Sequence, residues 1–519
     1  MKQLLTISAA VLLASFLSAA KVNLSVYPYP ATANIESSLI IPEQFSGTEN
    51  AELIITSPDG KVKKYAVKPV SGKPFFKWKP EMTGYHKIEL KGKNISAVRN
   101  VPAVWRRMYF FGWTVPTKAP ELAKYPVLGS CGVVIKGNPA VYAEYRKYGI
   151  RPLAYVSFRA AEIRLSDPIE KNVDKLVRKW QGILRSGADG IWIDEMGCYP
   201  DEKGLELIRV FGRALQQLNK LHPDKLVILC NAGTTQREQA AMCRNANVIL
   251  CPEIYPDCVN GVFGAVSFEK YLDSRIQILR ENDMLFERGY GKKSNPASYR
   301  RGCGVILLGL NNCFSVVEEP FNSKLEHYVR YIKKNAPEMG GLAFWSSGGD
   351  RRYLEKHIPY RLQNDLLERY YISPVLDVRG NYCSDYAPVK GKKLTVSCEV
   401  ANIGGMKLYR PYTLRAYAVD PTGKRELIGE AVRKVIGVGM GDVPVGISAE
   451  NVITWENEGN KYIATNRKGA LKAVNLGRHT IQFDFTPQMK GIYRLVFELD
   501  APEDIAVINS SSFRELYVR

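Results

Sequence analysis

Four carboxylates stand at the predicted ends of β-strands, where they could perform acid–base chemistry. Asp194 and Glu195 close the apolar run Ile191–Ile193, Glu253 closes a second run, and Glu287 closes a third. Two carboxyl groups that face one another can cleave a glycosidic bond, because one protonates the leaving oxygen while the other acts as nucleophile or base. We therefore take these four acids as the candidate catalytic residues. The alternative is that they only cap or solvate the ends of their strands.

Other side chains near the predicted strand ends are of the types that bind sugars. Sugar rings present apolar C–H faces beside their hydroxyl groups, so a glycan groove combines aromatic rings with amides, carboxylates and cations. The candidate substrate-binding residues are Trp113, Arg159, Trp192, Asn231, Tyr255, Asp257, Tyr290 and Trp345. The five histidines show no HExxH motif and no other metal-ligand spacing, and we expect neither a metal ion nor a cofactor.

The alternation of side chains along a strand assigns roles within the acid pair. Neighbouring residues of a strand point to opposite faces. Ile191 and Ile193 suit the side that faces helices, which turns Trp192 and Asp194 toward the interior. Glu195 would reach the same pocket only if the chain turned after Asp194. We therefore predict Asp194 as nucleophile or charge stabiliser and Glu253 as proton donor, with burial raising the pKa of Glu253.

Strands and helices alternate from residue 106 to about residue 370, which predicts a (β/α)8 TIM barrel with its chemistry at the C-terminal strand ends. Helices are expected over 169–184, 205–218, 139–148, 268–282, 297–310 and 323–335. Nine candidate strands compete for eight places, and the last place falls to either Cys313–Val317 or Gly341–Trp345. The other candidates are Met108–Trp113, Cys131–Ile135, Pro152–Phe158, Gly190–Asp194, Leu226–Asn231, Val248–Glu253 and Met284–Glu287.

The segments on either side of the barrel have the short apolar runs and turn signals of β-domains. Residues 1–20 read as a signal peptide cleaved near Ala20, which predicts export to the periplasm or the outside of the cell. Residues 21–105 are expected to form an immunoglobulin-like sandwich, and residues 371–519 a C-terminal β-sandwich. No later run is apolar and long enough to predict a transmembrane segment.

The net charge of +20 favours polyanionic partners, although lysine and arginine are dispersed and no nucleic-acid motif occurs. Five arginines near predicted strand ends would make the preferred glycan anionic if they line the groove. These are Arg159, Arg164, Arg288, Arg351 and Arg352. The ten cysteines lack regular spacing and are interpreted as buried thiols, except that Cys383 and Cys398 could pair across a hairpin.

The motif D-G-I-W-I-D-E-M at 189–196, followed by Tyr199–Pro200, resembles the fourth-strand signature of barrel glycoside hydrolases. It is similar to the D-G-I-x-x-D motif of exported hypothetical glycoside hydrolases and to motifs of α-glucosidase-like and chitinase-like barrels, although Trp192 replaces a chitinase acid. The resemblance implies an exported glycoside hydrolase acting on a poly- or oligosaccharide. It implies either Asp194 with an acid near Glu253 or Asp257, or the pair Glu195 and Glu287. The alternative is a non-catalytic glycan-binding or cell-envelope scaffold protein.

Overall fold

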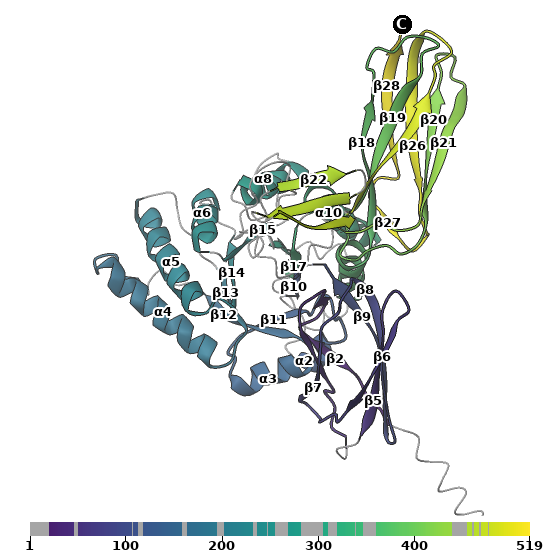
Figure 1. The fold of residues 1–519 in the computed structure, drawn as a ribbon. Coiled ribbons are helices and arrows are strands. Elements are labelled where there is room, and N and C mark those ends of the chain that lie inside the picture. Colours follow the sequence, from purple (N-terminus) through teal and green to yellow (C-terminus); the bar gives the residue numbers. More distant parts are fainter. Residues whose placement is uncertain are drawn as a thin grey trace, which may run out of the picture.

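Eight parallel strands close into a barrel at the centre of the chain (Figure 1). The computed structural model describes residues 20–45, 50–105, 107–112, 118–157, 163–194, 202–231, 236–246, 248–254, 268–281, 305–309, 319–337, 339–345, 360–438, 454–458, 461–466, 469–475 and 477–519. The barrel strands are β10 (Tyr109–Gly112), β11 (Cys131–Val134), β12 (Arg151–Ser157), β13 (Gly190–Asp194), β14 (Leu226–Asn231), β15 (Ile249–Ile254), β16 (Val305–Gly309) and β17 (Gly341–Trp345). Pairing of β17 with β10, from Tyr109 opposite Gly341, closes the ring.

Within the described part of the chain, a helix follows each barrel strand. The helices are α2 (Ala119–Leu122), α3 (Pro139–Lys147), α4 (Ile169–Arg185), α5 (Glu202–Leu221), α6 (Gln236–Ala246), α8 (Phe268–Glu281), α10 (Glu319–Asn335) and α12 (Tyr360–Leu367). Figure 1 shows α4, α5 and α6 side by side on the outside of the sheet. The apolar face predicted for α4 is buried, and Trp180 meets Phe211 of α5 at a ring distance of 5.6 Å. These strands and helices form the parallel barrel that the alternation of the sequence predicts.

The seventh strand is not where the sequence placed it. Residues 297–310 were expected to be helical, but Val305–Gly309 is strand β16 and lies between β15 and β17. A short continuous apolar run is compatible with a strand buried on both faces and with a buried helix, so periodicity could not distinguish them. The candidate strands Met284–Glu287 and Cys313–Val317 lie outside the described residues. Gly341–Trp345 is the eighth strand.

The interior of the barrel is filled by side chains. Phe111, Trp192 and Ile228 belong to one buried cluster inside the ring, with the rings of Phe111 and Trp192 5.0 Å apart. Ile191 and Ile193 belong instead to the large core that includes the surrounding helices. The described interior of the barrel is therefore a packed core, as the side-chain layers of such barrels usually form.

Two sheets precede the barrel. The larger contains β1 (Ala20–Lys21), β9 (Ile95–Val104), β8 (Gly84–Gly92), β5 (Ala51–Thr56) and β6 (Val62–Val67), with β3 (Ala31–Thr32) paired to β9. The smaller contains β2 (Ser25–Tyr27), β4 (Ser37–Ile40) and β7 (Pro74–Trp78). Leu39 of the smaller sheet and Leu53 and Ile88 of the larger are buried in the same core. The predicted signal peptide lies outside the described residues, apart from Ala20.

Three sheets follow the barrel. One contains β25 (Arg478–Phe485), β19 (Leu394–Asn402), β18 (Val375–Cys383) and β27 (Ala506–Val507), and the second β21 (Arg425–Arg433), β20 (Tyr412–Val419), β26 (Gly491–Asp500) and β28 (Ser511–Val518). The third contains β22 (Thr454–Glu458), β23 (Lys461–Asn466) and β24 (Gly469–Asn475). Val396 of the first and Leu414 and Phe497 of the second share one core.

The suggested pairing of Cys383 with Cys398 is wrong. Both are free thiols on neighbouring strands, but Cys383 lies opposite Val396 and Cys398 opposite Asn381. The two sulfurs are thus held in different rows of the sheet.

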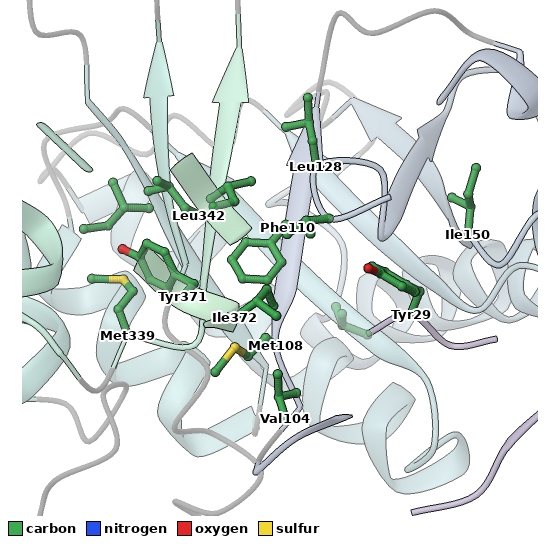
Figure 2. Close-up of a cluster of buried hydrophobic side chains, with 14 of the residues drawn as sticks. Tyr29, Val104, Met108, Phe110, Leu128, Ile150, Met339, Leu342, Tyr371 and Ile372 are labelled. Atoms are coloured by element: carbon green, nitrogen blue, oxygen red, sulfur yellow. The ribbon is translucent and has the colours of Figure 1, made fainter. Parts of the chain in front are cut away.

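One apolar core joins the N-terminal sheets, the barrel and the segment that leads to the C-terminal sheets (Figure 2). Phe110 of β10 packs edge-on against Tyr371, which belongs to a π-helical turn, η3 (Glu368–Ile372), at a ring distance of 5.7 Å. Val104 of β9 and Leu342 of β17 belong to the same cluster. Among the described helices, none has the length and apolar character needed to cross a bilayer.

Candidate functional site

Three side chains with reactive atoms converge from three consecutive strands at the C-terminal end of the barrel. Asp194 is the last residue of β13, and Cys230 and Glu253 are each the last but one of β14 and β15. A carboxylate oxygen of Asp194, the sulfur of Cys230 and a carboxylate oxygen of Glu253 all lie within 4.8 Å of one another. Asp194 and Glu253 are half-buried, and Cys230 is fully buried. The carboxyl ends of parallel strands meet at one rim, which is why chemistry in this fold gathers there.

Strand geometry explains why these three residues meet. Trp192 lies two residues before Asp194, Ile228 two before Cys230, and Cys251 two before Glu253, and all three belong to the buried interior cluster. Residues two apart on a strand share a face, so the reactive residues continue the inward-facing rows. An apolar layer therefore lies below the acids and lowers the local dielectric constant, which strengthens the electrostatic interactions of the site.

A tyrosine hydroxyl holds Asp194. The hydroxyl group of Tyr155, on β12, donates a hydrogen bond of 3.0 Å to Oδ2 of Asp194. Tyr155 is paired in register with Trp192, one inward-facing position below Asp194. A hydrogen bond to a carboxylate favours the charged form. The contact restrains the orientation of the Asp194 carboxylate.

A buried thiol contacts Glu253. The sulfur of Cys230 donates to Oε1 of Glu253 at 3.3 Å. Burial raises the pKa of the Cys230 thiol well above its usual value, and hydrogen bonding to Cys251 and the charges of Glu253 and Asp194 act in the same direction. Cys251 is paired with Cys230 in the sheet register. Cys230 is therefore a protonated donor to Glu253 in this arrangement.

The structure brings together Asp194 and Glu253, the two residues that the sequence analysis favoured. Trp192, expected to offer an aromatic face to substrate, is completely buried and forms part of the layer below the acids, so it is not an exposed platform. Asn231 ends β14 and Trp345 ends β17, as predicted, at the same rim of the barrel. Glu195, Glu287, Trp113, Arg159, Tyr255, Asp257 and Tyr290 lie outside the described residues.

Two residues of this site were missed from sequence. Cys230 was grouped with the core cysteines, and its burial is as expected, but its position beside the acids was not foreseen. Tyr155 was treated only as part of a strand. The alternation of side chains along each strand could have identified both residues. Tyr155 shares the inward face of its strand with Leu153, and Cys230 shares that of its strand with Ile228. Their convergence became evident only when the strands were set in register.

The first aspartate of the 189–196 motif has a different role from the second. Asp189 precedes β13 and so lies at the opposite end of the barrel from Asp194. Its carboxylate accepts two hydrogen bonds from Arg146, from Nε to Oδ2 at 2.9 Å and from Nη2 to Oδ1 at 2.8 Å, and a third from the hydroxyl of Tyr27. Tyr27 belongs to β2, so Asp189 ties the barrel to the N-terminal sheets.

Gly190 is required by close packing. A Cβ atom on this residue would lie 2.0 Å from the carbonyl oxygen of Leu226 and 2.8 Å from a side-chain atom of Leu153. The motif thus combines an anchoring acid just before β13, a close-packed glycine at its start and the candidate catalytic acid Asp194 at its end.

The donor set of Asp194, Cys230 and Glu253 also fits a metal ion. Two carboxylate oxygens and a sulfur are a mixed set of the kind that Zn²⁺ accepts. The expectation of no metal rested on histidine spacing, which does not detect a site of this composition.

Comparison with known proteins gives distant structural likenesses. A scan of protein-family models finds no match, and a search of curated proteins finds no significant sequence similarity. The Bacteroides uniformis beta-glucuronidase structure is 11% identical, with a TM-score of 0.35, over 96% of this chain and 60% of that chain. This chain therefore spans about three fifths of the length of that enzyme.

Two further structures match parts of the chain. An endo-beta-N-acetylglucosaminidase from Cordyceps militaris is 12% identical, with a TM-score of 0.35, over 50% of this chain and 90% of that chain. A CARDB domain from Pyrococcus furiosus is 13% identical, with a TM-score of 0.17, over 28% of this chain and 88% of that chain.

Proposed function

We propose that this chain is an exported glycoside hydrolase in which Asp194 and Glu253 form the catalytic pair. The observation that carries the proposal is the approach of their carboxylate oxygens to within 4.8 Å at the C-terminal ends of barrel strands. Retaining glycosidases hold their carboxyl groups about 5–5.5 Å apart, whereas inverting enzymes need about 6.5–9.5 Å to admit a water molecule. Nearest oxygen atoms within 4.8 Å are compatible with the retaining arrangement.

We assign different roles to the two acids. The hydrogen bond from Tyr155 favours the ionised form of Asp194, as a nucleophile requires. In the first step Glu253 donates its proton to the glycosidic oxygen while Asp194 attacks the anomeric carbon, and the bond to the leaving group breaks. In the second step Glu253 takes a proton from water, the water oxygen bonds to the anomeric carbon, and Asp194 is released.

The substrate is proposed to be an anionic poly- or oligosaccharide. The net charge of +20 supports this choice, and the arginines predicted near the rim would pair with carboxylate or sulfate groups. Export rests on the signal-peptide pattern of residues 1–20. We also propose that residues 21–105 and 371–519 form β-sandwich domains that flank a barrel of residues 106–370 and help to hold the polymer.

Digestion of a glycan panel tests the proposal. The wild type should release reducing ends from at least one glycan, and the double variant Asp194→Asn/Glu253→Gln should release none. Asp167→Asn is a matched control, since Asp167 is a surface acid paired with Lys171, and it should cleave like the wild type. Cleavage by the double variant would overturn the assignment of the pair. Retention of a glycan by the wild type without cleavage of any linkage would indicate a binding or scaffold protein instead.

A further inference from the structure

The placement of a thiol between two carboxylates is not needed for glycoside hydrolysis. An acid and a nucleophile suffice for that reaction, yet the sulfur of Cys230 lies 3.3 Å from Oε1 of Glu253 and within 4.8 Å of a carboxylate oxygen of Asp194. Each of the three groups comes from a different strand of one rigid barrel. The arrangement therefore offers a preformed set of two oxygens and one sulfur.

We propose that Asp194, Cys230 and Glu253 bind a thiophilic divalent cation such as Zn²⁺, and that this ion competes with substrate. The ion would occupy the position between the two acids and engage both of them. Only the competition rests on the proposed hydrolase function, because binding of the ion itself requires no activity.

The distances suit this ion after small side-chain movements. Zinc lies about 2.3 Å from sulfur and about 2.0–2.2 Å from carboxylate oxygen, so tetrahedral ligand atoms are about 3.5 Å apart. The sulfur of Cys230 and Oε1 of Glu253 already meet this separation at 3.3 Å. The remaining separations, all within 4.8 Å, need to close by at most about 1.3 Å. Three protein ligands leave the fourth tetrahedral position for water or a substrate oxygen.

The surroundings of the three ligands favour binding. Tyr155 orients Asp194 by its hydrogen bond to Oδ2, in the way that outer groups orient metal ligands in known sites. On binding, the sulfur–metal bond forms and the proton of the Cys230 thiol passes to solvent or buffer. Sulfur prefers zinc, cobalt and cadmium to magnesium and calcium, which gives the site a predicted selectivity.

Titration with Co²⁺ provides a direct test. The probe is Co²⁺ alone, added to the reduced mature chain without a histidine tag. The wild type should show a thiolate-to-cobalt charge-transfer absorption that saturates at one ion per chain and is abolished by added Zn²⁺ but not by Mg²⁺. Cys230→Ser should lose this absorption. Cys243→Ala is the matched control, since Cys243 is a buried thiol on α6 outside the barrel interior. This variant should keep the charge-transfer absorption.

Three outcomes would overturn the proposal. They are the absence of the absorption in the wild type, its persistence in Cys230→Ser, and its loss in Cys243→Ala. If a glycan substrate is found, Zn²⁺ should inhibit its cleavage, a chelator should reverse the inhibition, and the inhibition constant should rise more than about tenfold in Cys230→Ser. Cobalt binding without any hydrolysis would support the metal site and contradict the hydrolase, so the two proposals fail separately.

Discussion

The hydroxyl of Tyr155 on β12 lies 3.0 Å from Oδ2 of Asp194 on the adjacent strand β13. Hydrogen bonds to charged groups contribute about 1.5–3 kcal/mol, which corresponds to roughly 10–100-fold in rate if the bond matters in the transition state. We expect Tyr155→Phe to lower kcat by about that factor with little change in KM. Tyr386→Phe, at an exposed tyrosine of the C-terminal region, should leave both constants unchanged. An unaltered kcat in Tyr155→Phe would show that the bond does not serve catalysis.

Replacing two glycines of neighbouring elements by alanine should change the free energy of unfolding in opposite directions. A Cβ on Gly190 would collide with the carbonyl oxygen of Leu226 at 2.0 Å, so β13 would have to shift. We expect Gly190→Ala to lower the free energy of unfolding by at least about 1–3 kcal/mol. Gly182 lies on the exposed side of α4 with nothing within 4 Å of its Cβ position. Gly182→Ala should raise the free energy of unfolding by about 0.5–1 kcal/mol. Urea unfolding measures both, and equal effects would contradict the packing described for β13.

Loss of the anchoring acid should affect stability and not chemistry. Asp189→Ala removes the partner of Arg146 and the acceptor of the Tyr27 hydroxyl. Because both partners are partly buried, we expect unfolding to become easier by about 2–3 kcal/mol. Asp167→Ala, at an exposed ion pair, should cost less than about 1 kcal/mol. Thermal unfolding and the activity per folded molecule distinguish the two roles. A specific loss of kcat in folded Asp189→Ala would mean that Asp189 takes part in the reaction.

Two buried histidines should make the fold sensitive to acid. Burial lowers the pKa of His86 to about 4, and burial with the charge of Arg433 lowers that of His479 to about 4. An unfolded histidine titrates near 6.5, so between pH 6.5 and 4 the unfolded chain binds a proton that the folded chain does not. Stability is thus fully present above pH 6.5 and falls as the pH drops toward 4, by up to about 3 kcal/mol for each histidine.

Replacement of one histidine isolates its share of this effect. The free energy of unfolding of His479→Gln should fall less steeply between pH 7.5 and pH 4.5 than that of the wild type. His327→Gln, at an exposed histidine on α10, should show the slope of the wild type. Identical slopes in all three proteins would rule out His479 as a source of acid sensitivity.

Much of the barrel could be predicted because strand geometry is reflected directly in the sequence. The alternation in Gly190–Asp194 correctly directed Trp192 and Asp194 inward, since neighbouring side chains must face opposite sides. The seventh strand was misplaced because the run Val305–Leu308 has no period that separates strand from helix. The Cys383–Cys398 pairing failed because the hairpin register places Cys383 opposite Val396 and Cys398 opposite Asn381.

The composition of the site was less accessible than its location. Strand ends identified Asp194 and Glu253, but the contact of Cys230 with Glu253 depends on the relative register of β14 and β15. No pattern within a single strand encodes that register. Asp189, only five residues before Asp194, could be separated from it in role only by knowing which end of the strand each occupies.

The dependence of cleavage on the leaving group tests the catalytic pair most directly. The experiment compares wild type, Glu253→Ala and Asp194→Ala on two substrates. One is a glycan that the wild type cleaves, and the other is the aryl glycoside of the same sugar, whose phenolate leaves without protonation. Glu253→Ala should lose the glycan activity and retain turnover of the aryl glycoside, because only the former needs a proton donor. Asp194→Ala should turn over neither. Equal loss on both substrates in Glu253→Ala, or retained turnover in Asp194→Ala, would contradict the assignment of Glu253 as acid and Asp194 as nucleophile.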